Sequence, residues 1–349
     1  MLVSLIDLAA QYQSLKPEID EAVARVLSKG QYVNGEEVEK FESEWAEYCK
    51  AKYAVAVSSG TDALYLAARV YATWQTNTWT TPRTFIGTVE PLIRNQKYHQ
   101  YNPVLILSDD SPPAKNKESL VYVPVHLYGY PTPIPKKRDY KVIEDSAQAH
   151  GQPLRGDAAC FSYYPTKNLG AVGQGGSVVS NDKDFIDAVR ILRSHGETGG
   201  RFRHQYLSGN YRMDELQAAI LRAKLPHLDA WNKRRREIAK LYCQHLAGVE
   251  GIALPKDHLE HVFHIFAIET PKRDSLAAFL KEHGVQTAVR YPIPLHLQPA
   301  LAHLGYKKGD FPDAERWADE TLSLPIYPEI SDDQVEYVIE QIREWALLQ

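Results

Sequence analysis

Short apolar runs, separated by turns and helical stretches, recur along the first half of the chain. Strands that are covered on both faces, as in parallel sheets with helices on either side, read as continuous apolar runs. The runs are Tyr53–Val57, Thr84–Ile86, Val104–Leu107, Leu120–Gly129, Lys141–Asp145, Ala158–Tyr164 and Gly176–Ser180. The sequence therefore predicts an α/β fold built around a mostly parallel central sheet.

Helical patterns lie before and between these runs. Lys16–Lys29 has Pro17 in its first turn and Gly30 directly after its end, as helices prefer. Large side chains at spacings of three and four predict a second helix that packs in a core or a dimer interface: Val38, Phe41, Trp45 and Tyr48. Further helices are expected at Ala63–Trp74, Asp184–Ser194, Asp214–Leu225 and Trp231–Leu246, with Pro226 breaking the last two apart.

The pattern changes near Gly251, where strands and helices become short and mixed. The expected strands are Val262–Glu269 and Val285–Tyr291, and the expected helices are Asp274–His283, Asp313–Leu322 and Ser331–Leu348. The last helix opens on a Ser331…Gln334 capping pattern. A chain of 349 residues has room for two domains. We expect a large domain over residues 1–245 and a small α+β domain over residues 246–349.

Charge and composition limit the classes of partner and the cellular compartment that we expect for this chain. The formal net charge of −4 disfavours a nucleic-acid binder, and the basic run Lys233–Arg236 is interpreted as the solvated face of a helix. The cysteines Cys49, Cys160 and Cys243 are far apart and typical of a reduced, cytosolic protein. The first residues lack the basic region of a signal peptide, and no apolar run approaches the ~18 residues of a membrane span. We therefore expect a cytoplasmic protein without nucleic-acid or membrane partners.

The stretch from residue 142 to 176 carries the clearest chemical signal. An apolar run ends in Asp145, where parallel sheets bind ligands, and Lys167 follows in a loop between Pro165 and Gly-Gln-Gly-Gly at 173–176. An amine that forms a Schiff base, with a carboxylate that keeps a pyridine nitrogen protonated, is what pyridoxal phosphate requires of an enzyme. The alternatives are a helix N-cap for Asp145 and an ordinary surface lysine for Lys167.

A second signal is the turn Ser-Ser-Gly-Thr-Asp at residues 58–62, between a predicted strand and a predicted helix. Unpaired backbone N–H groups and the helix dipole make such a turn a candidate phosphate site, and a plain capped connection is the alternative. The turn lacks the Gly-x-Gly-x-x-Gly of dinucleotide-binding folds, which argues against a nicotinamide oxidoreductase.

These segments and several others resemble the DegT/DnrJ/EryC1/StrS family of pyridoxal-phosphate-dependent sugar aminotransferases over nearly the whole chain. The matching segments are Leu-Val-Ser-Leu-Ile-Asp-Leu at 2–8, Ser-Gly-Thr-Asp-Ala-Leu at 59–64, Val-His-Leu-Tyr-Gly at 125–129, Glu-Asp-Ser-Ala-Gln at 144–148, Phe-Ser-Tyr-Tyr-Pro-Thr-Lys-Asn-Leu-Gly at 161–170, Gly-Asn-Tyr-Arg-Met-Asp-Glu-Leu-Gln-Ala-Ala at 209–219 and Ser-Leu-Pro-Ile-Tyr-Pro at 323–328. The resemblance implies the type I fold of pyridoxal phosphate enzymes, like that of aspartate aminotransferase.

The resemblance also implies the roles of the central residues. Lys167 would form the Schiff base with the cofactor aldehyde and, once displaced by the amino donor, move the proton during transfer. Asp145 would pair with the ring nitrogen, and Gln148 would lie near the ring or its phenolic oxygen. Phe85 would stack on the pyridine face, unless it is a plain core phenylalanine. The cofactor phosphate would be held by Gly60, Thr61 and Ser162.

Other implied contacts extend beyond one chain. Asn210 would reach the phosphate of the neighbouring subunit, which would make a homodimer with shared active sites obligatory, and Arg212 would help it or brace the loop. Arg290, Tyr291 and His296 are expected near the substrate. The remaining histidines of interest fit no metal-ligand spacing, so no metal is expected: His126, His195 and His264.

Two positions depart from the family pattern. Gln174 stands where relatives often have an acid, and Arg290 where they often have a histidine. Neither change removes the catalytic chemistry. An additional cation at position 290 would suit the negative charge of a sugar diphosphate.

The function that this resemblance implies is transfer of an amino group from L-glutamate to a keto carbon of a nucleotide-linked 6-deoxyhexose, with pyridoxamine phosphate formed between the half-reactions. We expect dTDP as the nucleotide and C3 as the aminated carbon, within deoxyamino sugar biosynthesis for lipopolysaccharide or O-antigen. Amination at C4 is the first alternative, and a catalytically silent regulator that binds the cofactor is the second. A dehydratase is disfavoured because such relatives replace the lysine at position 167 with histidine.

Overall fold

The computed structural model describes residues 1–71, 77–96, 105–108 and 120–349. A seven-stranded sheet has the order β1-β7-β6-β5-β4-β2-β3. Its strands are β1 (Tyr53–Val57), β2 (Asn77–Thr80), β3 (Leu105–Leu107), β4 (Leu120–Tyr122), β5 (Lys141–Asp145), β6 (Ala158–Ser162) and β7 (Gly176–Ser180). The strands from β3 to β6 pair in parallel, and β7 runs antiparallel to both β6 and β1. The predicted, mostly parallel sheet is therefore confirmed.

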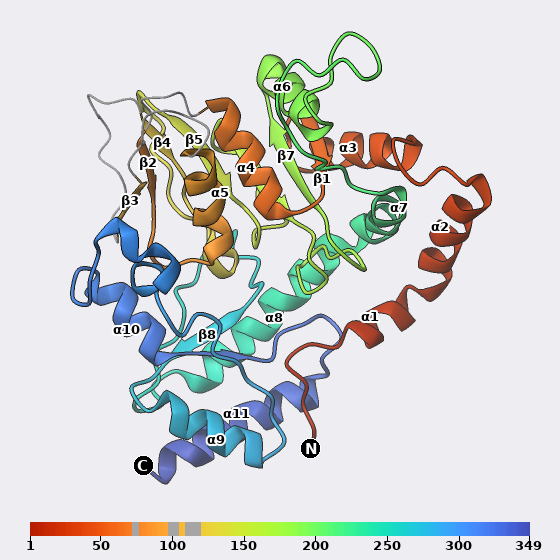
Figure 1. Ribbon diagram of the computed structural model, residues 1–349. Coiled ribbons are helices and arrows are strands. Elements are labelled where there is room, and N and C mark those ends of the chain that lie inside the picture. Colours follow the sequence, from red (N-terminus) through yellow and green to blue (C-terminus); the bar gives the residue numbers. More distant parts are fainter. Residues whose placement is uncertain (72–76, 97–104, 109–119) are drawn as a thin grey trace.

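Helices cover both faces of this sheet (Figure 1). The helices of this part of the chain are α1 (Leu8–Ser14), α2 (Lys16–Lys29), α3 (Glu36–Tyr48), α4 (Gly60–Tyr71), α5 (Ile86–Gln96), α6 (Lys183–Arg193), α7 (Glu215–Lys224) and α8 (Leu228–Leu246). The helices from α3 to α7 lie against the sheet, whereas α1 and α2 pack against α7 and α8. Successive residues of a strand point to opposite faces, so Val55 and Val57 pack with α4, α5 and α6, whereas Ala54 and Ala56 pack with α3 and α7. This double covering explains why the strands read as continuous apolar runs.

The C-terminal part forms a second core around a two-stranded antiparallel sheet. Its elements are β8 (Phe266–Glu269), α9 (Arg273–Glu282), α10 (Pro312–Glu320), β9 (Thr321–Leu324) and α11 (Asp332–Leu347). Ile238, Tyr242 and Leu246 of α8 belong to this core, and so does Val3. Figure 1 shows α8 running from the large sheet to this part. The division at residue 245 stays a prediction, and this packing favours a boundary within α8.

Two predicted strands are wrong. Thr84–Ile86 is the end of a loop and the start of α5, because Pro82 cannot donate to a ladder and the Thr84 and Thr88 hydroxyls bond one turn apart at 2.7 Å. The segment Val285–Tyr291 makes only isolated bridges, from Val285 to Val3 and from Ala288 to Ser323. Among the predicted elements, residues 72–74 and Val104 lie outside the described residues. The elements without a predicted counterpart are α1, α5, β2 and β9.

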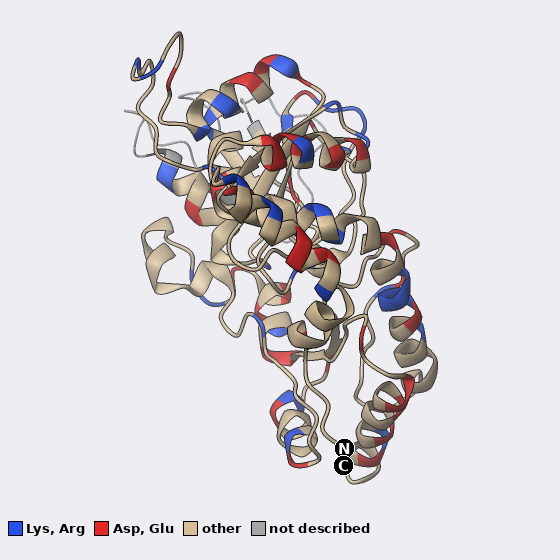
Figure 2. Cartoon of the chain, turned by 90° about the vertical axis from the view of Figure 1, so that its right-hand side faces the viewer, with Lys and Arg blue, Asp and Glu red and all other residues tan. Residues whose placement is uncertain are grey.

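Charge is mixed over the face shown in Figure 2, where acidic and basic residues alternate along the helices. Both termini lie at the end of the molecule formed by α9 and α11, in both views. None of the helices in the described part combines the length and the apolar character that crossing a membrane requires.

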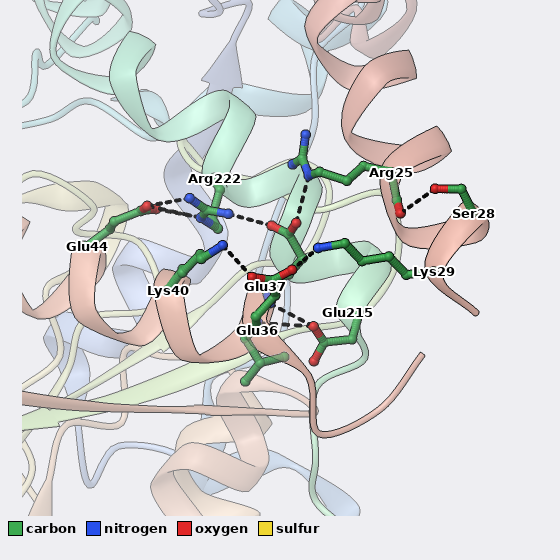
Figure 3. A network of polar contacts seen from close by, with 10 residues as sticks. Arg25, Ser28, Lys29, Glu36, Glu37, Lys40, Glu44, Glu215 and Arg222 are labelled. Carbon is green, nitrogen blue, oxygen red and sulfur yellow. Dashed lines mark hydrogen bonds and ion pairs between the residues drawn. The ribbon is translucent and has the colours of Figure 1, made fainter. Parts of the chain in front are cut away.

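One buried acid, Glu215 of α7, connects α7 to the start of α3. The Glu215 carboxylate is buried and accepts hydrogen bonds from the N–H groups of Gly35 (2.7 Å) and Glu37 (2.8 Å) at the start of α3. A β-carbon at position 35 would lie 2.7 Å from Glu215 Oε2, so the contact also requires glycine there. Figure 3 shows this cap beside Arg222, which bonds Glu37 and Glu44. Glu215 thus supplies the cap that α3 lacks from its own N-cap residue.

We predict that Glu215→Ala lowers the free energy of unfolding by about 2–3 kcal/mol, because buried N–H groups lose their acceptor. Denaturant unfolding followed by circular dichroism measures the change. Glu36→Ala is the matched control: Glu36 belongs to the same network, but its side chain is 42% exposed where it pairs with Lys40, and its loss should cost less than about 1 kcal/mol. Equal losses in the two variants would contradict the capping role.

Candidate active site

Two neighbouring strands end at the same edge of the sheet and place the polar residues of the candidate site. Asp145 is the last residue of β5, and Ser162 is the last residue of β6. The strands are parallel, with Asp145 opposite Cys160. Loops leaving this edge must therefore turn over one shared region, as expected for a ligand site in an open α/β sheet.

Asp145 is buried, yet within the described residues its carboxylate accepts hydrogen bonds from two neutral donors only. Thr88 Oγ1 donates to Oδ2 at 2.6 Å, and the Ala147 N–H donates to Oδ1 at 3.1 Å. Burial raises the pKa of Asp145, and these two hydrogen bonds together with the charge of Lys167 oppose the rise. No helix begins in the described segment that follows it, so the N-cap alternative is wrong. The arrangement suits a carboxylate that needs a cationic partner.

Lys167 lies in the loop between β6 and β7. Its backbone N–H donates to the Tyr164 carbonyl at 2.8 Å. Burial of the amine lowers the pKa of Lys167 to about 8, while the charge of Asp145 raises it and that of Arg290 lowers it. Lys167 and Asp145 therefore lie close enough to shift each other's pKa, and an ordinary surface lysine is excluded.

The turn before α4 packs directly against the ends of β6 and β7. A β-carbon at Gly60 would lie 2.6 Å from the Ser162 β-carbon, and one at Gly176 would lie 2.3 Å from the Ser59 carbonyl carbon. These close approaches explain the glycines at both positions. Within the described part of the chain, the N–H groups of Gly60 and Thr61 have no hydrogen-bond acceptor. Unpaired N–H groups at the start of a helix beside the Ser162 hydroxyl form a cradle that fits a phosphate.

An aromatic group borders the same region. Phe85 is 55% exposed, so the core alternative for it is wrong. Its ring centroid lies 6.2 Å from that of Tyr291, which in turn stacks with Tyr128 and Trp317. The β-carbon position of Gly87 lies 2.9 Å from the Phe85 ring and 3.1 Å from Thr61 Oγ1, which places Phe85 beside the phosphate cradle.

Gln148 links these aromatic side chains to the end of β5. Its Oε1 accepts the Tyr128 N–H at 2.6 Å, and its Nε2 donates to the Tyr291 hydroxyl at 3.0 Å. The sequence analysis did not select Tyr128, Thr88 or Trp317 as site residues. Tyr128 lies in Val-His-Leu-Tyr-Gly and has a positive φ of 59°, but no pattern in the sequence marks Thr88 or Trp317.

The predicted contacts from the neighbouring subunit lie elsewhere on the chain. Asn210 is exposed and its Oδ1 accepts from Arg212 Nε at 2.9 Å, as expected if Arg212 braces the loop. In the described residues, neither side chain bonds to the group around Lys167. Their contribution to a second subunit stays a prediction.

Other predicted positions divide into two groups. Arg290 is exposed but acts on Lys167 through its charge, and Gln174 is exposed. His296 is buried, and its Nε2 lies 2.9 Å from Glu315 Oε1. Its imidazole thus has a hydrogen-bond partner within the protein, and its burial argues against a substrate contact.

His126 is also engaged: its Nε2 lies 2.8 Å from Glu144 Oε2, and its Nδ1 accepts the Thr132 N–H at 3.0 Å. No described group of histidine, cysteine, aspartate and glutamate side chains is arranged to hold a metal ion.

The residues present fit pyridoxal phosphate. A buried carboxylate with spare acceptor capacity suits a protonated ring nitrogen, an amine of lowered pKa suits an aldehyde, and the glycine cradle suits a phosphate. The exposed ring of Phe85 is available for stacking.

Comparisons with known proteins agree with this reading. A model of the DegT/DnrJ/EryC1/StrS aminotransferase family matches residues 13–343. The chain is 39% identical over 368 residues to the pleiotropic regulatory protein of Geobacillus stearothermophilus, with 99% of each chain covered. It is 38% identical over 370 residues to the dTDP-3-amino-3,4,6-trideoxy-alpha-D-glucose transaminase of Streptomyces venezuelae, covering 99% of this chain and 96% of that protein.

The solved structure of S. venezuelae DesV in complex with a ketimine intermediate is similar over 99% of this chain and 98% of that chain, with a TM-score of 0.91 and 36% identity. These matches confirm the type I fold, the aminotransferase activity and the pyridoxal phosphate cofactor that the sequence predicts. The chain therefore belongs to the DegT/DnrJ/EryC1/StrS aminotransferase family.

Proposed function

We propose that this aminotransferase moves an amino group from L-glutamate to C3 of a dTDP-linked 3-keto-6-deoxyhexose. The main support is the proximity of Lys167 to Asp145 at the carboxyl edge of the sheet, where the charge of each residue shifts the pKa of the other. An amine and an acid so placed are the two groups that amino transfer needs from the protein.

Bound pyridoxal phosphate supplies an aldehyde that captures primary amines and a protonated ring that accepts electrons. In the proposal, Lys167 holds the cofactor and later moves the proton, and its lowered pKa keeps a larger share of the amine unprotonated and nucleophilic near neutral pH. Asp145 holds the proton on the ring nitrogen. Gly60, Thr61 and Ser162 bind the phosphate, and Phe85 stacks on the ring.

The substrate half of the proposal depends on a relative and on charge. The transaminase of S. venezuelae is named for a dTDP-3-amino sugar, which favours dTDP and C3 here. Arg290 is an exposed cation near Lys167 and would suit the diphosphate of a nucleotide sugar. In the proposal, Tyr291, whose hydroxyl accepts a hydrogen bond from Gln148, borders the sugar.

We further propose a homodimer in which Asn210 and Arg212 complete the partner's site. Both precede α7, with Asn210 exposed and Arg212 partly exposed, and they follow a segment that carries exposed apolar side chains such as Phe202 and Leu207. A second copy of the chain would cover them. The enzyme is proposed to act in the cytoplasm, where its three free cysteines would stay reduced.

A regulatory role is the second candidate, because one relative is named a pleiotropic regulatory protein. A regulator that binds the cofactor would use the same Lys167 and Asp145, so these two residues fit both candidates, and the relatives named as transaminases favour the enzyme.

We predict that L-glutamate decreases the visible absorbance of the loaded enzyme, and that a 3-keto dTDP-sugar restores it as the amino group leaves. NMR of the product then identifies the aminated carbon. Amination at C4 from the matched 4-keto sugar would establish the first alternative. A spectrum unchanged by glutamate, with no amino sugar from either ketone, would establish the regulator.

We predict that Lys167→Ala lowers the turnover rate by at least about a thousandfold, because both the covalent attachment and the proton carrier are lost. The melting temperature should change little. Lys183→Ala, which removes an exposed lysine of α6 that pairs with Asp187, is the control and should retain wild-type turnover. Near-normal turnover of Lys167→Ala would rule out its proposed role.

We predict that Asn210→Ala weakens cofactor retention and that its dimers are rescued by exchange with Lys167→Ala subunits. Half of the scrambled dimers are hybrids with one intact site each, so about a quarter of wild-type activity should return. Exchange of Lys167→Ala with Asp145→Asn is the control, since both residues serve the same subunit's site and no hybrid site is intact. Equal recovery in both mixtures, or in neither, would exclude a site shared through Asn210.

A further inference from the structure

The residue next to Lys167 is held by three hydrogen bonds in the protein interior. Asn168 is 2% exposed. Its Nδ2 donates to Asn232 Oδ1 at 2.8 Å and to the Val262 carbonyl at 3.0 Å, and its Oδ1 lies 3.1 Å from His264 Nδ1. Because both amide hydrogens are used, Oδ1 must accept and His264 Nδ1 must donate. The side chain therefore has one orientation only.

The first of these bonds leads to the segment that follows Asp145. Asn232 lies on α8, and its Nδ2 donates to the His150 carbonyl at 2.8 Å. A β-carbon at Gly151 would lie 2.4 Å from that nitrogen, and Gly151 has φ of +118°, so only glycine permits this approach. Two buried amides in series thus join the loop that carries the amine to the segment that carries the acid.

The other two bonds lead to the segment 262–264 before β8. Arg235, on the same helix as Asn232, is buried and its Nη1 donates to the carbonyls of Phe263 (3.3 Å) and His264 (3.4 Å). The interpretation of 233–236 as a solvated face is therefore wrong for Arg235. Burial and the charge of Lys167 lower the pKa of His264 well below its usual value, which keeps the imidazole neutral. Arg235 therefore holds in place the segment 262–264, to which the Asn168 side chain is hydrogen-bonded.

The loop around Lys167 has little regular structure of its own. Residues 163–175 form neither helix nor strand. The backbone near Lys167 is held by its bond to Tyr164 and by Leu169, which is buried in the core between the sheet and α3. Asn168, the next residue, adds three side-chain hydrogen bonds directly beside Lys167.

We propose that Asn168 is a positioning residue, which fixes the main chain beside Lys167 so that the amine stays shielded from water and close to Asp145. The inference depends on the proposed function, in that Lys167 is taken as the residue that binds the cofactor. A purely structural Asn168 would stabilise the fold and leave the amine unchanged.

The test uses the cofactor-free protein and measures how the Lys167 amine titrates. A small amount of pyridoxal phosphate is added between pH 6 and 11, borohydride reduction fixes it on the amine, and mass spectrometry counts modified Lys167. In wild type we expect the labelling rate to rise with a midpoint near pH 8, the lowered pKa of Lys167. In Asn168→Ala the pKa of Lys167 should rise toward its usual 10.5, because a looser loop admits water and burial is the larger influence on this amine, while weaker attraction to Asp145 opposes part of the rise.

A rise of one pH unit in that midpoint would lower labelling at pH 8 roughly fivefold, because fewer amines are unprotonated. Gln152→Leu is the matched control. Gln152 is also a buried amide, donating to the carbonyls of Gly129 (2.7 Å) and Glu260 (3.2 Å), but it does not touch the Lys167 loop. Its loss should reduce stability and leave the midpoint near pH 8.

Each result decides one question. If the label in wild type is found on other lysines and Lys167 stays unmodified, the proposed function itself is overturned. A midpoint that is the same in Asn168→Ala as in wild type, or an equal rise in Gln152→Leu, would overturn the positioning role alone.

Should Asn168→Ala fail to fold, Asn232→Ala decides, because it leaves the bonds of Asn168 to Val262 and His264 in place. A smaller rise of the midpoint supports the proposal, and no rise overturns it. Where both variants fold, the double variant should shift the midpoint no further than Asn168→Ala, since the two amides act in series.

Discussion

The site depends on the electrostatic interaction between the buried carboxylate of Asp145 and the amine of Lys167, at one edge of the mostly parallel sheet. Burying either charge alone is costly, and placing the two together recovers part of that cost. Among the described residues, Asp145 accepts hydrogen bonds only from the Thr88 hydroxyl and one backbone N–H, so its carboxylate keeps the acceptor capacity that the proposed cationic ring would need. Lys167, at a lowered pKa, is ready to act as a nucleophile. The fold produces this pair because β5 and β6 end side by side.

The loops over that edge contain little regular structure, so buried polar contacts hold them. A hydrogen bond between His126 and Glu144 connects the loop after β4 to β5. A second, between Asn168 and Asn232, connects the loop of Lys167 to α8. A third, from Gln148 to Tyr291, connects Tyr291 to the same edge of the sheet. These contacts join residues that are 18, 64 and 143 positions apart in the chain. Buried polar groups of this kind cost free energy unless fully paired, and once paired they admit one arrangement. That is what a site requiring fixed geometry needs.

Much of this organisation follows from local pattern. Strands buried on both faces read as apolar runs, and Ser331 with Gln334 forms the expected capping box. The errors occur where local pattern is weak. Thr84–Ile86 has apolar character but borders a helix, and Val285–Tyr291 is extended but pairs only at single residues with Val3 and Ser323. The residue type of Phe85 is compatible with a core position or a ligand contact, and its 55% exposure in the structure excludes the core position.

The sequence by itself determined the chemistry of the site, because an acid at a strand end, one lysine before a glycine-rich turn and a Ser-Gly-Thr turn are local features. Only the tertiary structure decided which distant groups support them. Glu215 caps a helix that lies 180 residues earlier, and Arg235 is buried within a basic run that looks solvated. Such contacts depend on the path of the whole chain, whereas periodicity records only which face of a helix or strand is apolar.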